Sequence, residues 1–170
     1  MATMNDSLFP LELLSLARLL LDECRERRLR IVTAESCTGG LVAGLLTEIA
    51  GSSDVVDRGF VTYSNRAKQA VLGVPGDLIA DVGAVSEPVA RFMAEGALEA
   101  SDAHIAVAIT GVAGPGGGSP MKPVGTVHFA TARANGPIHH RMERFGDVGR
   151  GRIRIESVRV ALEMMRERVG

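Results

Sequence analysis

Apolar and polar positions alternate along the chain with two different periods, which separate helices from strands. Apolar side chains three and four residues apart predict an amphipathic helix over residues 8–28, where Leu13, Leu16, Leu20 and Cys24 share one face. Short runs of apolar and β-branched residues predict buried strands instead. The same two patterns predict further helices at 38–50, 64–72, 86–100 and 152–169, and strands at 31–34, 55–63, 104–110, 124–131 and 138–145.

Two of these helices carry capping signals at their starts. Ser64 or Asn65 is expected to cap the helix that follows the second strand, and Ser86 is expected to cap the helix at 86–100. Glu87 and Pro88 support the second assignment, because an acidic side chain and a proline are both favourable in the first helical turn.

The order of the elements predicts the fold class. Strands and helices alternate through the first two thirds of the chain, and two adjacent strands joined at the turn signal 135–137 are followed by a last helix. This order is typical of a layered α/β domain with helices on both faces of its sheet. We expect a single domain over residues 1–170, a three-layer α/β/α sandwich with a mixed, mostly parallel sheet, onto which the helix 8–28 packs.

The composition fits an ordinary globular protein and argues against several partners. The 170 residues are 46% hydrophobic and 23% charged, with a formal net charge of −1. This balance disfavours nucleic acid as a partner, because affinity for a phosphate backbone comes from surplus Lys and Arg. The leucine-rich run 8–21 is interrupted by Glu12 and Arg18 and is too short to span a bilayer, and no positive charge precedes it as in a secretory signal. We therefore expect a cytoplasmic protein with no membrane partner.

No residue pattern indicates a metal or a cofactor. Cys24 and Cys37 do not have the spacing of a zinc site. The adjacent His139 and His140 fall in a predicted strand, where they point to opposite faces and cannot bind one metal together. His128, inside another strand, is expected to be a hydrogen-bonded structural residue.

Three polar or glycine-rich loops follow predicted strands. They are ESCTGG at 35–40, YSNRAK at 63–68 and TGVAGPGGG at 110–118. In an open α/β sheet, ligands bind outside the carboxyl ends of the strands. These loops are therefore the candidate chemical sites of the chain.

Each loop has a chemical interpretation and a plainer one. A serine at a tight strand-to-helix turn exposes its hydroxyl near backbone N–H groups that can hold an oxyanion or a phosphate, but Ser36 or Thr38 can equally serve only as a helix cap. Lys68 acts as a general base only if burial lowers its pKa well below about 10.4, and is otherwise a surface lysine. The glycines of 110–118 form either an anion-binding nest or a mobile surface loop. The residues alone thus indicate an anion or nucleotide site with a Ser–Lys pair, and they leave the substrate open.

Five motifs in one order closely resemble the CinA C-terminal domain family, which includes the stand-alone nicotinamide-nucleotide amidohydrolases. They are AESCTGG at 34–40, GSSDVVDRGFVTYSNRAK at 51–68, GAVSEPVA at 83–90, TGVAGPGGG at 110–118 and KPVGTV at 122–127. The resemblance covers roughly residues 29–145. It implies that the chain hydrolyses nicotinamide mononucleotide to nicotinic acid mononucleotide and ammonia, in pyridine nucleotide recycling, without a cofactor or a metal.

The resemblance also implies roles for single residues. By position in the motifs, Ser36 is the nucleophile, Lys68 is the base that takes its proton, and Tyr63 is a supporting hydrogen-bond donor or proton relay. The implied oxyanion donors are backbone amides near Gly39 and Gly40 or in the loop after Thr110. The implied substrate-binding residues are Thr38, Gly39, Gly40, Thr110, Gly111, Gly114, Gly116 and Arg150.

The chain departs from the family pattern just before its last helix. The family usually has an Arg-Asp pair after Phe-x-Gly-Asp, whereas this chain reads FGDVGRGR at 145–152. If this segment supplies an arginine for the phosphate, Arg150 or Arg152 takes that place. Many family members also carry a large additional N-terminal domain, and its activity is not expected of this chain.

Two other interpretations stay open. A non-catalytic nucleotide-binding or regulatory module of the competence/damage-inducible type would keep the glycine-rich loops and need neither Ser36 nor Lys68. A cysteine enzyme would use Cys37 instead. The family and the apolar outer helices lead us to expect a homodimer.

Overall fold

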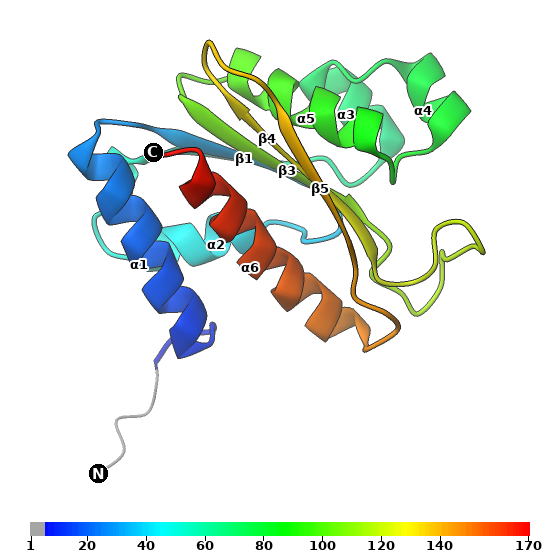
Figure 1. Cartoon of the computed structure of the whole chain (residues 1–170), viewed down its shortest axis with the longest axis horizontal. Helices are drawn as coiled ribbons and strands as arrows, with labels where there is room; N and C mark the ends of the chain where they lie inside the picture. The colour runs from blue at the N-terminus through cyan, green and yellow to red at the C-terminus, as the bar shows by residue number, and fades with distance from the viewer. Residues whose placement is uncertain (1–5) are drawn as a thin grey trace.

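The computed structural model describes residues 6–170, in which a five-stranded sheet lies between two layers of helices (Figure 1). The strands are β1 (Ile31–Glu35), β2 (Val56–Val61), β3 (Ile105–Gly111), β4 (Thr126–Arg133) and β5 (His139–Arg144). The helices are α1 (Leu11–Glu26), α2 (Leu41–Glu48), α3 (Asn65–Leu72), α4 (Gly76–Val82), α5 (Glu87–Glu99) and α6 (Arg150–Glu167), with a short 3₁₀ turn at Ser52–Asp54.

The strands lie in the order β2-β1-β3-β4-β5. Strand β1 is parallel to β2 and β3, whereas β4 is antiparallel to both β3 and β5. All strands except β4 therefore run in the same direction. The expected three-layer α/β/α fold with a mixed, mostly parallel sheet is confirmed.

The two helical layers cover opposite faces of the sheet. Helices α1, α2 and α6 pack on one face, and α3, α4 and α5 pack on the other (Figure 1). Strand β1 serves both layers, because Ile31 faces the first and Val32 and Ala34 face the second. The chain leaves β1 through α2 on one face and returns to β3 from helices on the other. The crevice at the carboxyl ends of β1 and β3 is thus the topological switch point, where α/β sheets bind ligands.

The observed element boundaries correct several predictions. Helix α2 begins at Leu41 and not at 38, because residues 37–40 form a separate turn in which Gly39 and Gly40 have positive φ. Helix α6 begins two residues before the predicted start. Helix α4 was not predicted, because the glycines and proline at 73–76 indicate only the end of the preceding helix.

The two predicted helix caps have different outcomes. The Ser64 hydroxyl oxygen accepts the backbone N–H of Ala67 at 3.0 Å, so Ser64 caps α3 as expected. Ser86 stands at the cap position of α5, but its hydroxyl donates to the carbonyl of Gly83 at 2.8 Å. Ser86 is therefore the N-cap residue of α5, as expected, but its side chain ties down the preceding loop and makes no capping hydrogen bond.

A glycine allows the helix that carries Lys68 to pack closely on its neighbour. A Cβ atom at Gly96 of α5 would lie 1.9 Å from the carbonyl oxygen of Leu72, at the end of α3. Since no side chain fits that gap, the missing Cβ lets α3 approach α5 and fixes α3 on the sheet.

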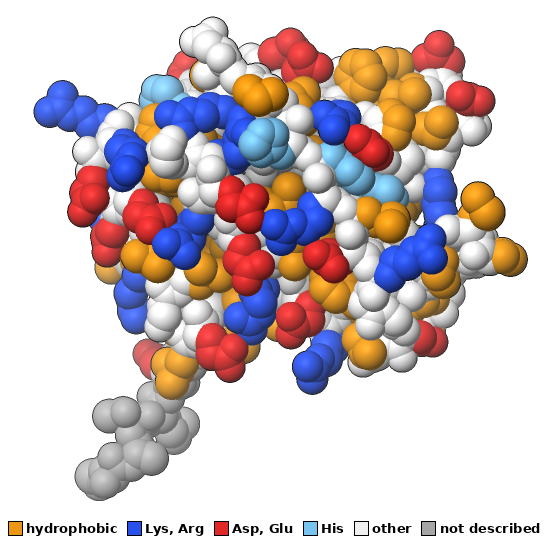
Figure 2. All heavy atoms as spheres, viewed as in Figure 1, with side chains coloured by type: hydrophobic (Ala, Val, Ile, Leu, Met, Phe, Trp, Pro, Cys, Tyr) orange, Lys and Arg blue, Asp and Glu red, His pale blue; other side chains and the backbone are white. Residues whose placement is uncertain are grey.

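Charges of both signs are interspersed on the face of the molecule seen in Figure 2. Ion pairs join different elements of the chain, as in the contacts of Arg159 with Glu12 and of Arg141 with Glu167. Among the described helices, none is long and apolar enough to cross a membrane. The prediction about a secretory signal concerns the first residues of the chain, of which 1–5 lie outside the described part.

Candidate active site

The candidate site lies where β1, β2 and β3 end side by side. The backbone N–H of Ser36 donates to Ile109 on the β3 side at 3.0 Å, and the N–H of Thr62 donates to Glu35 on the β2 side at 2.9 Å. A hollow of about 200 Å³ opens at this edge of the sheet. The residues around it include Ser36, Cys37, Tyr63, Asn65, Lys68, Thr110, Gly111 and Arg150.

Ser36 and Lys68 form a buried hydrogen-bonded pair in this hollow. Lys68 Nζ lies 3.0 Å from Ser36 Oγ and donates to the carbonyl oxygen of Thr62 at 2.7 Å. Lys68 is 1% exposed, and no carboxylate within residues 6–170 forms an ion pair with it. Burial lowers the pKa of Lys68 because it disfavours the charged ammonium. A lysine in this state is suited to take a proton from the serine hydroxyl.

A buried carboxylate fixes the turn that follows Ser36. The two carboxylate oxygens of Glu35 accept the backbone N–H groups of Val42 at 2.9 Å and Ala43 at 3.1 Å. These N–H groups belong to the first turn of α2, where a negative charge is favourable. Glu35 thereby closes the segment between β1 and α2 into a compact loop with Ser36 at its start.

The backbone of this turn leaves N–H groups available for an anion. The N–H of Ser36 is bonded to Ile109, and the N–H of Gly39 donates to the carbonyl of Ser36 at 3.0 Å. The N–H groups of Cys37 and Thr38 donate to no other residue in the described chain. Among the amides of residues 37–40, those of Cys37, Thr38 and Gly40 donate to no other described residue and can hold an oxyanion, whereas that of Gly39 is already bonded.

Arg150 joins Tyr63 to the glycine-rich loop at the mouth of the hollow. Its guanidinium donates to the carbonyl of Gly114 at 2.8 Å and to the Tyr63 hydroxyl at 3.1 Å. The Tyr63 side chain is largely exposed, and its hydroxyl hydrogen-bonds to Arg150 and not to Ser36 or Lys68. Thr110 donates its hydroxyl to the carbonyl of Ala84 at 2.9 Å, which holds the loop before α5 against the site.

Three other residues expected to bind substrate, Thr38, Gly39 and Gly40, do not line the hollow. Thr38 is fully buried below the hollow, and Gly39 and Gly40 lie in the turn beside Arg154 and Val61. The structure does not bring these three residues to the surface of the hollow, although they shape the turn that carries Ser36.

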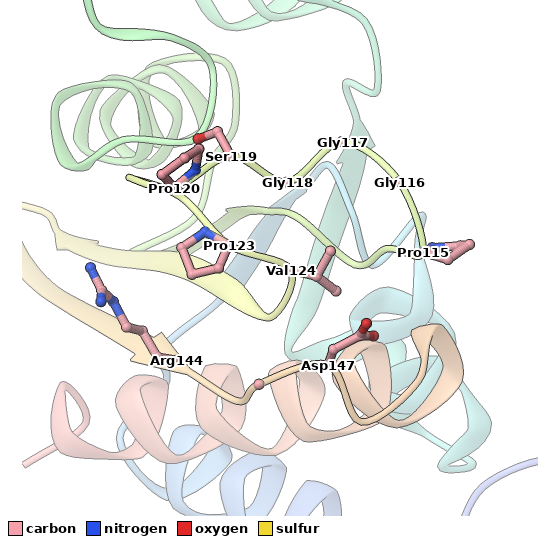
Figure 3. Close-up of a pocket in the computed structure, with 11 residues that line it drawn as sticks. Pro115, Gly116, Gly117, Gly118, Ser119, Pro120, Pro123, Val124, Arg144 and Asp147 are labelled. Carbon is pink, nitrogen blue, oxygen red and sulfur yellow. The ribbon is translucent and has the colours of Figure 1, made fainter.

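Gly116 lies in a second, larger hollow of about 650 Å³ beneath the glycine-rich loop (Figure 3). Arg144 and Asp147 flank that hollow, and Val124 and Pro123 lie between them. The glycines expected in one site are therefore divided: Gly111 lines the serine hollow, and Gly116 lines the second hollow.

Between the two arginines considered for the altered segment, the structure favours Arg150. Arg150 lines the serine hollow, whereas Arg152 is exposed and borders a different depression next to Glu12. The helical geometry explains the difference, since residues two apart on α6 point in nearly opposite directions.

Cys37 is poorly suited to be the nucleophile. Burial raises the pKa of its thiol to about 12. A thiol must form the thiolate to attack, and among residues 6–170 no histidine lines the hollow to take its proton. This environment favours Ser36 over its neighbour.

The histidines lie away from the hollow. His140 contacts His128, whose ring nitrogen lies 2.9 Å from its own, while His139 faces Arg168 on the other side of β5. The opposite orientation of His139 and His140 is confirmed. In residues 6–170 no three His, Cys, Asp or Glu side chains converge as metal ligands.

One residue at the site was missed by the sequence analysis. Arg154 of α6 donates from Nε to the carbonyl of Cys37 at 3.0 Å and from Nη2 to the carbonyl of Thr38 at 3.3 Å. The signal was present, because Arg154 follows Arg150 by four residues and therefore shares its face of the last helix.

Comparison with known proteins gives consistent results. The model of the CinA C-terminal domain matches residues 13–169. A CinA-like protein of Mycobacterium sp. (strain JLS) is 56% identical over 137 residues, which are 80% of this chain and 32% of that protein. A CinA-like protein of Anaeromyxobacter dehalogenans (strain 2CP-1) is 53% identical over 137 residues, 81% of this chain and 33% of that protein. The chain thus spans about a third of the length of these curated relatives.

Solved structures share the fold over nearly the whole chain. The competence/damage inducible protein CihA from Agrobacterium tumefaciens is 56% identical, with a TM-score of 0.93 over 95% of this chain and 98% of that one. A competence-damaged protein (CinA) superfamily protein from Klebsiella pneumoniae is 36% identical, with a TM-score of 0.87 over 92% of this chain and 97% of that one. With the family model matched from α1 to the end of α6, the chain belongs to the CinA C-terminal domain family.

Proposed function

We propose that the chain is an amidohydrolase that converts nicotinamide mononucleotide and water to nicotinic acid mononucleotide and ammonia. The observation that carries the proposal is the buried Ser36–Lys68 pair, with 3.0 Å between Nζ and Oγ. The substrate comes from the family resemblance of the motifs around that pair. The pair itself supports hydrolysis of an amide through a covalent acyl-enzyme.

In the first half of the reaction, Ser36 Oγ attacks the carboxamide carbon while its proton passes to neutral Lys68. The negative charge that develops on the carboxamide oxygen is held by the free backbone N–H groups of Cys37 and Thr38. The tetrahedral intermediate then collapses. Lys68 gives its proton to the leaving nitrogen, the C–N bond breaks, and ammonia departs from an ester on Ser36.

In the second half, water attacks the ester. Lys68 accepts a proton from the water, the same N–H groups hold the second oxyanion, and the C–Oγ bond breaks. Lys68 then returns its proton to Ser36 Oγ, which restores the resting pair, and nicotinic acid mononucleotide leaves as a carboxylate after its carboxylic acid gives its proton to water.

The dimensions of the hollow suit a small aromatic amide. A cavity of about 200 Å³ accommodates a pyridine ring with its carboxamide, and it leaves the ribose and phosphate at the mouth. Arg150 lines this hollow and donates to the carbonyl of Gly114, so we assign the phosphate to Arg150. A guanidinium at the mouth supplies the charge that a nucleotide monophosphate requires.

A regulatory nucleotide-binding module is the competing function. It gains nothing from a lysine that is buried without a carboxylate partner, because such burial penalises the charged form. The cost of this arrangement is understandable if the neutral amine is needed for chemistry.

The experiment is to supply nicotinamide mononucleotide to the purified chain, without added metal, and to measure ammonia release. Ser36→Ala is expected to abolish release, and Cys37→Ala, which keeps the backbone amide, is expected to retain it. No release from the folded wild-type chain would refute the deamidase function and favour the regulatory module. Loss in Cys37→Ala with full turnover in Ser36→Ala would refute the serine mechanism. A homodimer and a cytoplasmic location remain predictions.

A further inference from the structure

We propose that Arg154 is a positioning residue, which orients the backbone amides of the Ser36 turn toward the oxyanion through its two hydrogen bonds to that turn. The inference rests on the proposed function of the same site. It adds a residue on the last helix, far from the motifs that identify the family, to the apparatus that stabilises the transition state.

The contacts are direct and span the length of the chain. Arg154 reaches from the first turns of α6 to the carbonyls of Cys37 and Thr38, which are 117 and 116 positions away in sequence. The guanidinium also lies against Gly39, where a Cβ atom would be 3.1 Å from Nη2. Gly39 has a φ of +58°, so a glycine there permits both the turn and the approach of the arginine.

The geometry of a trans peptide turns these contacts into control of two N–H groups. In each peptide unit the C=O and N–H bonds point in opposite directions within one plane. Holding the carbonyl of Cys37 toward Arg154 therefore directs the N–H of Thr38 away from Arg154. The carbonyl of Ser36 is held in turn by the N–H of Gly39, which sets the direction of the Cys37 N–H. Arg154 thus orients the Thr38 N–H directly, through the carbonyl of Cys37. It orients the Cys37 N–H indirectly, because its bond to the Thr38 carbonyl positions the Gly39 N–H that holds the carbonyl of Ser36.

The rest of the turn provides no substitute for this anchor. Glu35 holds the start of α2, and Ser36 is fixed by β3, so that both ends of the segment are tied. Between them, the side chain of Thr38 makes no hydrogen bond within the described residues. Within the described residues, Arg154 is the one partner of the Cys37 carbonyl, whereas the Thr38 carbonyl also accepts the backbone N–H of Leu41 at 3.0 Å.

The charge of Arg154 acts in the same direction. No carboxylate in residues 6–170 forms an ion pair with it, so its charge is directed to the turn. Burial dominates the pKa of the neighbouring Cys37 thiol and raises it, but the positive charge of Arg154 acts against that rise. The same field favours a negative charge that forms beside Cys37 during the reaction.

The test uses a reagent that needs no knowledge of the substrate. A fluorophosphonate probe reacts with an activated serine: Ser36 Oγ bonds to phosphorus, the P–F bond breaks, fluoride leaves, and the serine proton passes to Lys68. The second-order rate constant, followed by intact mass, is compared among wild type, Arg154→Met, Arg154→Lys and Arg152→Met. Arg152 is the matched control, because it is exposed on the same helix and bonds nothing at the site.

Arg154→Met is expected to lower the labelling rate at least about tenfold, since displacing an oxyanion donor typically costs that much or more. Arg154→Lys keeps the charge but donates from a single nitrogen, so its rate is expected to lie between those of Arg154→Met and wild type. With nicotinamide mononucleotide the same variants are expected to lose kcat while KM changes less than about threefold, as for an interaction made in the transition state.

Each outcome is decisive. Wild-type rates in both Arg154 variants, or an equal loss in Arg152→Met, would overturn the role of Arg154. If Arg154→Met does not fold, as judged by circular dichroism, Arg154→Lys carries the test, and a wild-type rate would overturn the inference. Labelling of wild type without turnover of nicotinamide mononucleotide refutes only the proposed substrate. Failure of wild type to label at Ser36 overturns the inference and the serine mechanism together.

Discussion

Replacing Lys68 by methionine separates the chemical role of this lysine from its effect on stability. Methionine has a similar length and needs no partner in the core, but it has no proton to exchange. We expect Lys68→Met to abolish turnover, because no other base contacts Ser36 Oγ in the described chain. We also expect it to remove a pH dependence of stability that the wild-type chain has.

The sign of that dependence follows from the direction of the pKa shift. Burial lowers the pKa of Lys68 in the folded chain, whereas the unfolded chain keeps a value of about 10.4. Between these two values the unfolded chain binds one more proton than the folded chain, so the free energy of unfolding rises with pH by about 1.4 kcal/mol per unit. Below the folded pKa both states are protonated, and the full penalty for the buried charge is present.

A second effect of the substitution does not depend on pH. Lys68 Nζ donates to the buried carbonyl of Thr62 at 2.7 Å, and methionine leaves that carbonyl unbonded. Such a loss costs roughly 1–3 kcal/mol at every pH. As pH rises between the folded and the unfolded pKa of Lys68, the free energy of unfolding of the wild type is therefore expected to increase relative to that of Lys68→Met. The test is how this difference in unfolding free energy changes with pH, and not its sign at one pH.

The assay benefits from the sequence, which contains only two lysines, Lys68 and Lys122. Urea unfolding of wild type, Lys68→Met and Lys122→Met at a series of pH values gives the free energies, and both variants lose one positive charge. Burial raises the pKa of the Cys24 thiol to about 11 and that of Cys37 to about 12, which lowers stability as the unfolded thiols ionise at high pH. This effect is shared by all three proteins and is largely removed in the comparison.

Labelled lysine provides a direct check, because its NMR spectrum holds two side-chain signals. The signal lost in Lys68→Met is expected to titrate below about 10.4, the ordinary lysine value. The reasoning is refuted if that signal titrates at or above the ordinary value. It is also refuted if wild type and Lys68→Met differ by the same free energy at every pH.

Three further substitutions test the contacts that hold the Ser36 turn, helix α3 and Arg150 in place around the site. Glu35→Gln retains one acceptor oxygen for the two backbone N–H groups of α2, so the free energy of unfolding is expected to fall by about 1–3 kcal/mol. A loss below about 0.5 kcal/mol would contradict the role of the carboxylate. Gly96→Ala would place a Cβ 1.9 Å from the carbonyl of Leu72, and we expect about 1–3 kcal/mol of destabilisation in urea unfolding. Tyr63→Phe removes the hydroxyl that is hydrogen-bonded to Arg150 at an exposed site. We expect KM to rise while the free energy of unfolding changes by less than about 0.5 kcal/mol. A large loss of kcat would instead support a proton relay through the hydroxyl.

The spacing of apolar residues is enough to predict the layers of this fold, because that spacing is a local property that each segment carries independently. The sequence placed most helices and strands within a few residues and identified the mixed sheet from their order. It also located the loops that hold Ser36 and Lys68, since both follow strands. Helix α4 was missed because its seven residues lie directly after a glycine- and proline-containing segment that indicates only a helix end.

Which of these residues meet, and which are buried, follows only from the three-dimensional packing of the elements. Ser36 and Lys68 are 32 positions apart, and only the neighbouring order of β1 and β2 brings them within 3.0 Å. Hydropathy assigns a lysine to the surface, so the burial that lowers the pKa of Lys68 was not available from the sequence. The same holds for Arg150 in preference to Arg152, and for Arg154 on the turn of Ser36, because each depends on how α6 lies across the sheet. Periodicity fixes what one segment can form, but contacts between distant segments and the burial they produce depend on the packing of the whole chain.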